Sequence, residues 1–220
     1  MHDDITRALG AVEREVQQRQ YLGQTVDVVR LSRTYDTDIA DLWDALTRAE
    51  RIARWFLPVS GDLRLGGRYQ LTGNAGGEIT RCHPPEELGV TWEFGAQRTW
   101  VEVRLSALGP ERTSFVLEHL APHGGEHWDK FGPGAVGVGW DLTLGGLERH
   151  LASGAPNDHE AAERWATSPE GKAFVRGSSA RWGRAAIAAG AAPEMAEAAA
   201  ARTAGFYTGE PPASPTGSRS

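Results

Sequence analysis

Apolar residues near the start of the chain recur at helical spacing. Ile5, Leu9, Val12 and Val16 follow one another at intervals of four, three and four positions. This spacing places their side chains on one face of an α-helix. We therefore expect an amphipathic helix over residues 4–20, within an N-terminal segment 1–24.

Two-residue alternation replaces the helical spacing from residue 25. Residues 25–35 are rich in β-branched residues, which is typical of an extended strand. Arg33 alternates with Val29 and Leu31, so its side chain should face the same side as these apolar residues. A guanidinium on that face would require a carboxylate partner.

Two short helices are expected after this strand. Asp38 can cap the first, whose apolar positions fall within residues 39–46. Thr47-x-x-Glu50 has the form of a capping box, which predicts a second helix beginning there and stopped by Pro58.

A series of short alternating segments then runs to about residue 121. Leu88, Val90, Trp92 and Phe94 alternate for four steps, and Phe115, Leu117 and His119 do the same. A period of two puts each set on one face of its strand. The turns between the segments are short, so an antiparallel meander is the simplest topology.

The longest helix is expected after Gly132-Pro133, with proline at the first helical position. Its apolar residues recur every three or four positions over residues 136–151. One face must therefore lie on something apolar, and the sheet is the only large candidate.

An alanine-rich helical extension, residues 155–209, follows Gly154. Asn157-x-x-Glu160, Ser168-Pro169 and Pro193 mark three helix starts. Four large apolar residues in the extension must pack on the domain or on a second subunit, so a homodimer through these helices is possible: Trp165, Phe174, Trp182 and Ile187. The Pro-, Ser- and Gly-rich tail, residues 210–220, is expected to be disordered.

These elements predict an α+β protein. Residues 25–154 should form about six antiparallel strands followed by one long helix, and the helical extension comes after it. The net charge of −6 is spread along the chain, which argues against a nucleic-acid partner.

The chain has no apolar run long enough for a membrane span and no secretory pattern at its start, so we expect it in the cytoplasm. The single cysteine, Cys82, is expected to be a small buried residue.

Several short motifs occur in an order that resembles a known family. The motifs are similar to those of proteins related to the activator of the 90-kDa heat-shock-protein ATPase. They are the sequence from Arg33 to Phe56, Gly66-Gly67-Arg68-Tyr69, Gly77-Glu78-Ile79, Leu117-Glu118-His119 and Gly139-Trp140-Asp141. The resemblance covers residues 25–152 and implies the helix-grip fold of the START-like, or SRPBCC, superfamily. In this fold a curved antiparallel sheet, here of about six to seven strands, wraps on a long C-terminal helix. The extension lies outside the resemblance.

The resemblance leaves function open. Members of the superfamily bind lipids or aromatic molecules, cyclise polyketides, or protect a producer from its own antibiotic. The eukaryotic co-chaperones carry a separate N-terminal domain that contacts the chaperone, and the 24 residues before the first strand are too few for it. Fold alone does not choose among these activities.

Aromatic residues are candidates for the lining of an apolar cavity, where flat ligands bind by stacking and dispersion. The alternative for each is a packed core, which is favoured for Trp92 and Trp140 because they sit mid-element. Trp55 and Phe131 lie at element ends near a possible mouth. The candidate ligand-binding set is Trp55, Phe56, Tyr69, Trp92, Phe115, His119, Trp128, Phe131, Val136 and Trp140.

His119 is the one candidate for acid–base chemistry, because it shares an apolar face with Phe115 and Leu117. It could orient a ligand hydroxyl, move a proton, or be a core histidine bonded to a backbone carbonyl. His119, His123 and His127 have a metal-like spacing, but the proline and glycines between them should prevent a helix. We expect no metal and no cofactor.

Two neighbouring positions complete the expectations. Glu118 should be a surface carboxylate, and Trp100 faces away from Val101 and could pack under the extra helices. The favoured function is binding of a small apolar or aromatic ligand, as a carrier or for sequestration or resistance, because convergent acid–base residues are lacking. The alternatives are a polyketide cyclase or aromatase using His119, and a protein-interaction module or chaperone co-factor.

Overall fold

A computed structural model describes residues 2–156 and 158–210, and its strands form one antiparallel sheet. The sheet order is β1-β2-β8-β7-β6-β5-β4-β3, so the prediction of a curved antiparallel sheet is confirmed, with more strands than expected. The strands are β1 Glu13–Tyr21, β2 Gln24–Tyr35, β3 Val59–Gly61, β4 Arg68–Leu71, β5 Gly76–His83, β6 Glu87–Phe94, β7 Gln97–Gly109 and β8 Arg112–Pro122.

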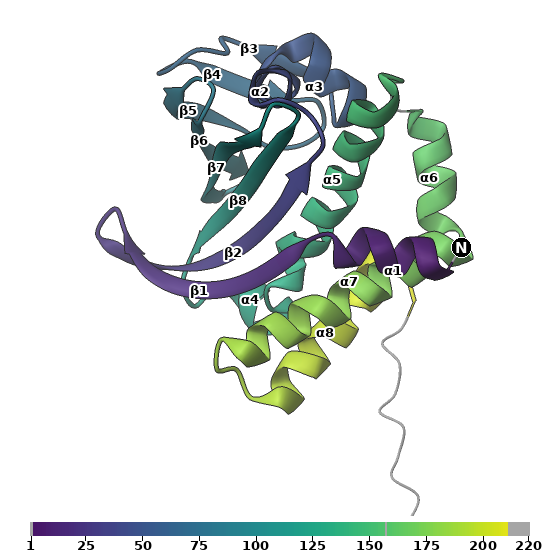
Figure 1. Ribbon diagram of the computed structural model, residues 1–220. Helices are drawn as coiled ribbons and strands as arrows, with labels where there is room; N and C mark the ends of the chain where they lie inside the picture. Colours follow the sequence, from purple (N-terminus) through teal and green to yellow (C-terminus); the bar gives the residue numbers. More distant parts are fainter. Residues whose placement is uncertain (1, 157, 211–220) are drawn as a thin grey trace, which may run out of the picture.

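Helix α5, Gly134–Ser153, lies along the concave face of the sheet, as the helix-grip fold requires (Figure 1). Its apolar face buries Leu144 and Leu147 against inward residues of the strands, including Phe115 and Leu117. The helix begins one residue later than predicted, because Pro133 is its N-cap. Gly154 ends it in the left-handed conformation that favours glycine.

The N-terminal helix is shorter than the sequence pattern predicts. Helix α1, His2–Gly10, ends before Val12, and the rest of the predicted helix over 4–20 is strand β1. β1 pairs with β2 along its whole length, through a hairpin turn with positive φ at Leu22 and Gly23. An edge strand with mostly polar residues on both faces carries little periodic signal. Val12 and Val16 continue the helical spacing of Ile5 and Leu9, but both lie beyond the end of α1.

Helices α2, Ile39–Thr47, and α3, Ala49–Trp55, follow β2 as expected. Asp38 caps α2 by accepting a hydrogen bond from the Asp41 N–H at 2.8 Å. The capping box at Thr47 is wrong. The Thr47 hydroxyl donates instead to the carbonyl of the preceding turn, and Arg48 is the N-cap of α3 without a side-chain cap.

The C-terminal helices pack on α5 and on the N-terminal segment. They are α4 Glu126–Phe131, α6 His159–Thr167, α7 Pro169–Ala188 and α8 Pro193–Thr208. Ser168 caps α7 and Pro169 is its first residue, both as predicted. Asn157 lies outside the described residues, and Asp158 caps α6. In Figure 1 α1 crosses α7, so the N-terminal helix packs on the C-terminal extension.

The predicted disordered tail falls almost entirely outside the described residues, which end at Glu210. Glu210 itself is held by the Lys172 ammonium at 2.9 Å and by Arg176. Trp182 of α7 is fully buried, so its predicted apolar packing is satisfied within the chain, whereas Trp165 of α6 stays exposed.

Two outward residues of the sheet are covered by the end of the β1–β2 hairpin, which curves back over the convex face. Trp100 packs edge-on against Tyr21, with ring centroids 5.3 Å apart, and not under the extra helices. Glu118 points outward as expected but is buried, with Arg19 at 2.8 Å, so it is not a surface carboxylate. Both corrections have one cause, because Arg19 and Tyr21 of the edge strand β1 reach residues of β7 and β8.

Candidate ligand-binding site

An apolar cavity of about 140 Å³ lies between the concave face of the sheet and helices α2, α3 and α5. Strands β3 to β8 all contribute side chains to it, and no charged residue lines it among the described residues. We call it the inner cavity. Its lining is Leu46, Thr47, Ile52, Trp55, Phe56, Val59, Leu63, Tyr69, Leu71, Ile79, Cys82, Leu88, Val90, Trp92, Val101, Val103, Phe115, Leu117, Trp140 and Leu144.

The polar ends of two lining residues are already satisfied within the protein. The Trp55 indole N–H donates to the Ala45 carbonyl at 2.8 Å, and the Tyr69 hydroxyl donates to the Thr91 carbonyl at 2.8 Å. Burial raises the pKa of Tyr69 well above its ordinary value, so the phenol stays neutral. The inner cavity therefore presents ring surfaces and not hydrogen-bonding groups.

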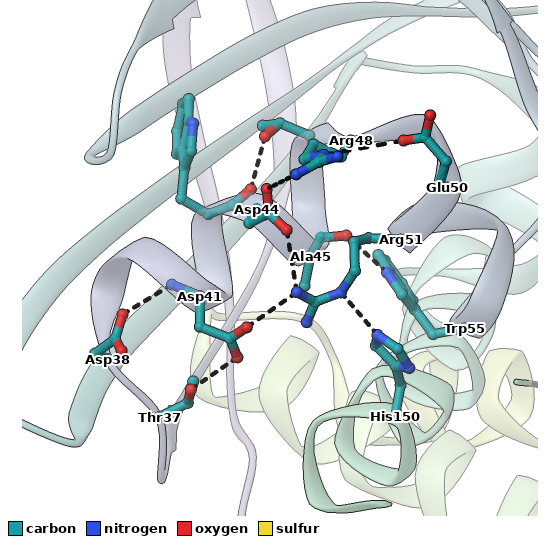
Figure 2. A network of polar contacts seen from close by, with 12 residues as sticks. Thr37, Asp38, Asp41, Asp44, Ala45, Arg48, Glu50, Arg51, Trp55 and His150 are labelled. Atoms are coloured by element: carbon teal, nitrogen blue, oxygen red, sulfur yellow. Dashed lines mark hydrogen bonds and ion pairs between the residues drawn. The ribbon is translucent and has the colours of Figure 1, made fainter. Parts of the chain in front are cut away.

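A polar network fixes α3, which forms one wall of the inner cavity, against α2 and α5 (Figure 2). The Arg51 guanidinium donates to Asp41, Asp44 and the Nε2 atom of His150, each at 3.0 Å. Burial opposes ionisation of Asp41, but hydrogen bonds from Arg51 and Thr37 outweigh it and lower the pKa of that carboxyl.

Helices α3 and α5 also touch through their backbones at Gly146. A Cβ atom at this position of α5 would lie 2.4 Å from the Trp55 carbonyl oxygen. Only glycine allows so close an approach, so the end of α3 is held by contact as well as by charge.

A second, larger cavity of about 500 Å³ lies at the other side of the same aromatic residues. We call it the outer chamber. α5, α8 and the tip of the β6–β7 hairpin supply most of its walls. Its lining is Phe56, Asn74, Trp92, Phe94, Gln97, Thr99, His119, His127, Ala135, Val136, Gly139, Trp140, Thr143, Phe206 and Tyr207.

Three aromatic residues, Phe56, Trp92 and Trp140, line both cavities and so form the wall between them. The rings of Trp92 and Trp140 are tilted against each other with centroids 5.3 Å apart. Phe56 stacks on Trp55 at 5.7 Å. We call these three residues the aromatic divider.

His119 faces inward as predicted, but its surroundings are those of a structural residue. Its Nδ1 atom accepts from the Trp140 indole N–H at 3.0 Å, and its Nε2 atom lies 2.9 Å from the Thr99 hydroxyl. Burial lowers the pKa of His119 to about 4, so the ring is neutral at ordinary pH. Both ring nitrogens have partners, and neither partner is the backbone carbonyl that the sequence analysis considered.

Most of the predicted ligand-binding residues lie in one cavity wall or the other. Trp55, Tyr69 and Phe115 line the inner cavity, and His119 and Val136 line the outer chamber, with the divider between them. Trp128 and Phe131 line neither. Both belong to α4.

Phe131 packs instead on the aromatic residue Phe206 of α8, at 5.5 Å. Phe206 and Tyr207 were missed because they lie in the extension, beyond the family resemblance. Nothing in the local pattern of an alanine-rich helix could have placed them beside β6. Arg33 faces inward with Glu148 of α5 as its carboxylate partner at 3.1 Å, as its position required.

Within residues 2–156 and 158–210, no cluster of His, Cys, Asp or Glu is arranged to hold a metal ion. The Nδ1 atom of His123 lies 3.0 Å from the buried carboxylate of Asp27, and His127 contacts Phe131. In the same part of the chain, no helix combines the length and apolarity that a membrane crossing needs.

The fold and its divided cavity define a helix-grip protein. The family model for Activator of Hsp90 ATPase homolog 1-like protein matches residues 36–152, just over half of the chain. The chain belongs to this family. No curated protein matches it.

Two structures of CalU16 from Micromonospora echinospora resemble the chain over more than the family region. The solution structure is 33% identical, with a TM-score of 0.66, and the match covers 81% of this chain and 97% of CalU16. The crystal structure is 30% identical, with a TM-score of 0.66, covering 80% and 99%. Matches of this extent include elements on the flanks of the family domain.

More distant structures share the fold alone. The HSP90 activator PFC0360w from Plasmodium falciparum is 21% identical with a TM-score of 0.50, and the match covers 60% of this chain and 99% of that one. DynU16, a protein of the dynemicin biosynthetic locus, is 22% identical with a TM-score of 0.51, covering 59% and 48%.

Proposed function

We propose that this protein binds a small, neutral, apolar or aromatic molecule in the inner cavity, as a carrier or to sequester it. The observation that supports this most directly is the volume and lining of that cavity. An apolar cavity of about 150 Å³ engineered into another protein stays dry and binds benzene. The inner cavity, at about 140 Å³, has room for a ligand group of that size.

The chemistry of the walls favours a neutral ligand. A charged group would lose its hydration on entering, and no charged side chain lines the inner cavity among the described residues. The ring faces of Trp55, Trp92 and Trp140 offer dispersion and stacking to an aromatic ring. Both nitrogens of His119 are engaged, so binding fits the geometry better than acid–base catalysis through that residue.

Toluene is a suitable probe for the inner cavity, and Cys82 offers a second readout. Cys82 is the only cysteine in the chain and lines this cavity. We expect saturable toluene binding by calorimetry, a higher melting temperature with toluene, and slower modification of Cys82 by N-ethylmaleimide when toluene is bound. Native mass spectrometry of freshly purified protein would look for a bound natural ligand.

A variant that fills the inner cavity tests the proposal, and the same change outside the cavity is its matched control. Val90→Phe adds bulk inside the inner cavity, whereas Val116→Phe makes the same change at a half-buried position outside both linings. We expect Val90→Phe to weaken toluene binding roughly five- to hundredfold, the equivalent of about 1–3 kcal/mol of overpacking. Val116→Phe should leave it unchanged. No saturable binding to the wild type, with no protection of Cys82, would refute the proposal.

A further inference from the structure

The outer chamber is built from two parts of the chain that are far apart in the sequence. Trp92, Phe94 and Gln97 come from the β6–β7 hairpin, and Thr143 comes from α5. Further residues of the region matched by the family model, among them Phe56, Asn74, His119 and His127, complete this side of the chamber. Phe206 and Tyr207 come from α8, which lies outside that region. The chamber therefore depends on the C-terminal extension.

Three hydrogen bonds hold α8 in place beside the chamber. The Tyr207 hydroxyl donates to the Ala135 carbonyl at 3.0 Å, and the Thr203 hydroxyl donates to the Phe131 carbonyl at 2.8 Å. The Arg202 Nε–H donates to the Lys130 carbonyl at 2.6 Å. All three bonds lead from α8 to the segment from α4 to the start of α5, so the wall is fixed and not a loose helix end.

Aromatic rings dominate the walls and the rim of the outer chamber. Six Phe, Trp and Tyr residues line it. Two of them remain largely exposed on opposite sides, Phe94 at 58% on β6 and Phe206 at 65% on α8. Large exposed aromatic residues around a cavity are typical of a surface that binds a ligand or partner, because binding removes their apolar area from water.

The chamber has few polar groups, and some of them are unused. No Asp, Glu, Lys or Arg lines it among the described residues. The side chains of Gln97 and Thr143 make no hydrogen bond within the described part of the chain, although both face the chamber. They can offer a donor and an acceptor to a bound molecule. The chamber volume, about 500 Å³, lies in the range of small-molecule sites.

Among the residues that the structure describes, Phe56 is the divider residue whose side chain has neither a polar bond nor a ring contact to another divider residue. Trp140 is held to His119, and Trp92 packs against both rings. Phe56 is half-buried at the end of α3, and its ring contact is the stack on Trp55. A change of the Phe56 rotamer is the simplest way to connect the two cavities.

We infer that the outer chamber is a second ligand compartment, and that the ligand is a neutral, flat aromatic molecule with hydrogen-bonding substituents and a small apolar end. The apolar end enters the inner cavity beside Phe56. The aromatic body lies between Trp92 and the α8 residues Phe206 and Tyr207, with its substituents toward Gln97 and Thr143. This inference rests on the proposed function and names the class of ligand.

N-phenylnaphthylamine is a neutral aromatic probe that is too large for the inner cavity and becomes fluorescent in apolar surroundings. Thr143→Trp fills the outer chamber from α5 without touching the inner cavity, and Thr80→Trp makes the same change at an exposed strand position. We expect wild type and Thr80→Trp to bind the probe alike. Thr143→Trp should bind it at least about tenfold more weakly, with toluene affinity unchanged.

Phe206→Ala provides an independent test should Thr143→Trp fail to fold, since a residue exposed to this extent contributes little to stability. Loss of one ring contact should weaken probe binding about two- to tenfold. Two results overturn the inference while leaving the proposed function intact. One is toluene binding without probe binding, and the other is probe affinity unchanged in both variants. Absence of toluene and probe binding in the wild type removes both proposals.

Discussion

Trp140 donates its indole N–H to the Nδ1 atom of His119 over 3.0 Å. An indole N–H can only donate, so Nδ1 must accept and the proton of the neutral ring sits on Nε2. Nε2 then donates to the Thr99 hydroxyl at 2.9 Å, which donates to the Trp92 carbonyl at 3.1 Å. This chain of bonds joins α5 to β6, β7 and β8 and fixes one ring of the aromatic divider.

The first prediction concerns acid stability. His119 has a folded-state pKa of about 4, below the ordinary value of 6.5, so the unfolded chain binds the proton more readily. This pKa difference contributes about 3 kcal/mol to the free energy of unfolding above pH 6.5, and the contribution is lost as the pH falls toward 4. His119→Gln keeps a donor and an acceptor but does not titrate. Urea unfolding between pH 7 and 4 should therefore show a smaller stability loss for this variant, and equal losses would contradict the assignment.

The second prediction separates structure from ligand binding at His119. His119→Phe leaves the Trp140 indole N–H without its acceptor in a buried site. We expect a loss of about 1–3 kcal/mol in the free energy of unfolding, with toluene affinity unchanged because His119 does not line the inner cavity. A ligand-orienting role would instead leave the melting temperature unchanged and weaken the binding of a ligand that carries a polar group.

The third prediction compares two glycines on one helix. A Cβ at Gly137 would lie 2.3 Å from the Trp182 ring, whereas at Gly145 the nearest atom is the flexible end of Arg149 at 3.7 Å. Alanine favours a helix over glycine by about 1 kcal/mol. Gly145→Ala should therefore raise the melting temperature. Gly137→Ala should lower the melting temperature, because overpacking should cost about 1–3 kcal/mol in the free energy of unfolding. Calorimetry of the two variants would show shifts of opposite sign.

The fourth prediction concerns the buried carboxylate that joins the extension to α5. Asp141 receives two bonds from Arg14, at 2.9 and 3.0 Å, one from the Ser178 hydroxyl at 2.5 Å and one from the Trp182 indole at 3.1 Å. Asp141→Asn leaves the charge of Arg14 buried without a counter-charge. We expect a loss of about 3–5 kcal/mol by denaturant unfolding.

The matched control for Asp141 is Glu160→Gln in α6. Glu160 is highly exposed and pairs with Arg164 at 3.5 Å. Removing this pair should change stability by less than about 0.5 kcal/mol. Similar losses for the two variants would show that the buried pair has no special role in joining the extension.

The fifth prediction tests the network of Figure 2 as the support of the inner-cavity wall. Arg51→Ala removes the bonds that join α3 to α2 and α5. We expect Cys82 to react with N-ethylmaleimide roughly five- to thirtyfold faster, since local opening should become easier by about 1–2 kcal/mol. Arg48→Ala, which removes exposed ion pairs on the same loop, should leave the rate unchanged. Equal rates in both variants would exclude this role for Arg51.

The sequence pattern predicted the elements that bury one face. Strands β6 and β8 and helix α5 each carry a run of apolar residues at the right period, and burial on one side enforces that period. β1 carries no such run of apolar residues, because it lies at the edge of the sheet. Its pairing with β2 depends on the turn at Leu22-Gly23, a signal that was not weighed.

The site was predictable only where parity fixes a side chain. Trp92 and Phe115 could be placed on the concave face from their own strands alone. The partners of His119 could not, because Thr99 and Trp140 come from a neighbouring strand and from α5. Phe206 lies on a helix whose position is set by contacts with α4 and α7. The dimer expected through the C-terminal helices stays a prediction.

The ion pair between Arg14 and Asp141 joins positions 127 residues apart, and Trp182 lies a further 41 residues along the chain. Closing so long a loop is slow, because its entropy must be lost before the contact gives anything back. We expect the hairpins of the sheet to form early, while the guanidinium of Arg14 remains in water. β1 precedes the other strands of the sheet in the sequence, but its inward face is covered only when α7 arrives, so the sheet edge and the C-terminal extension complete folding together.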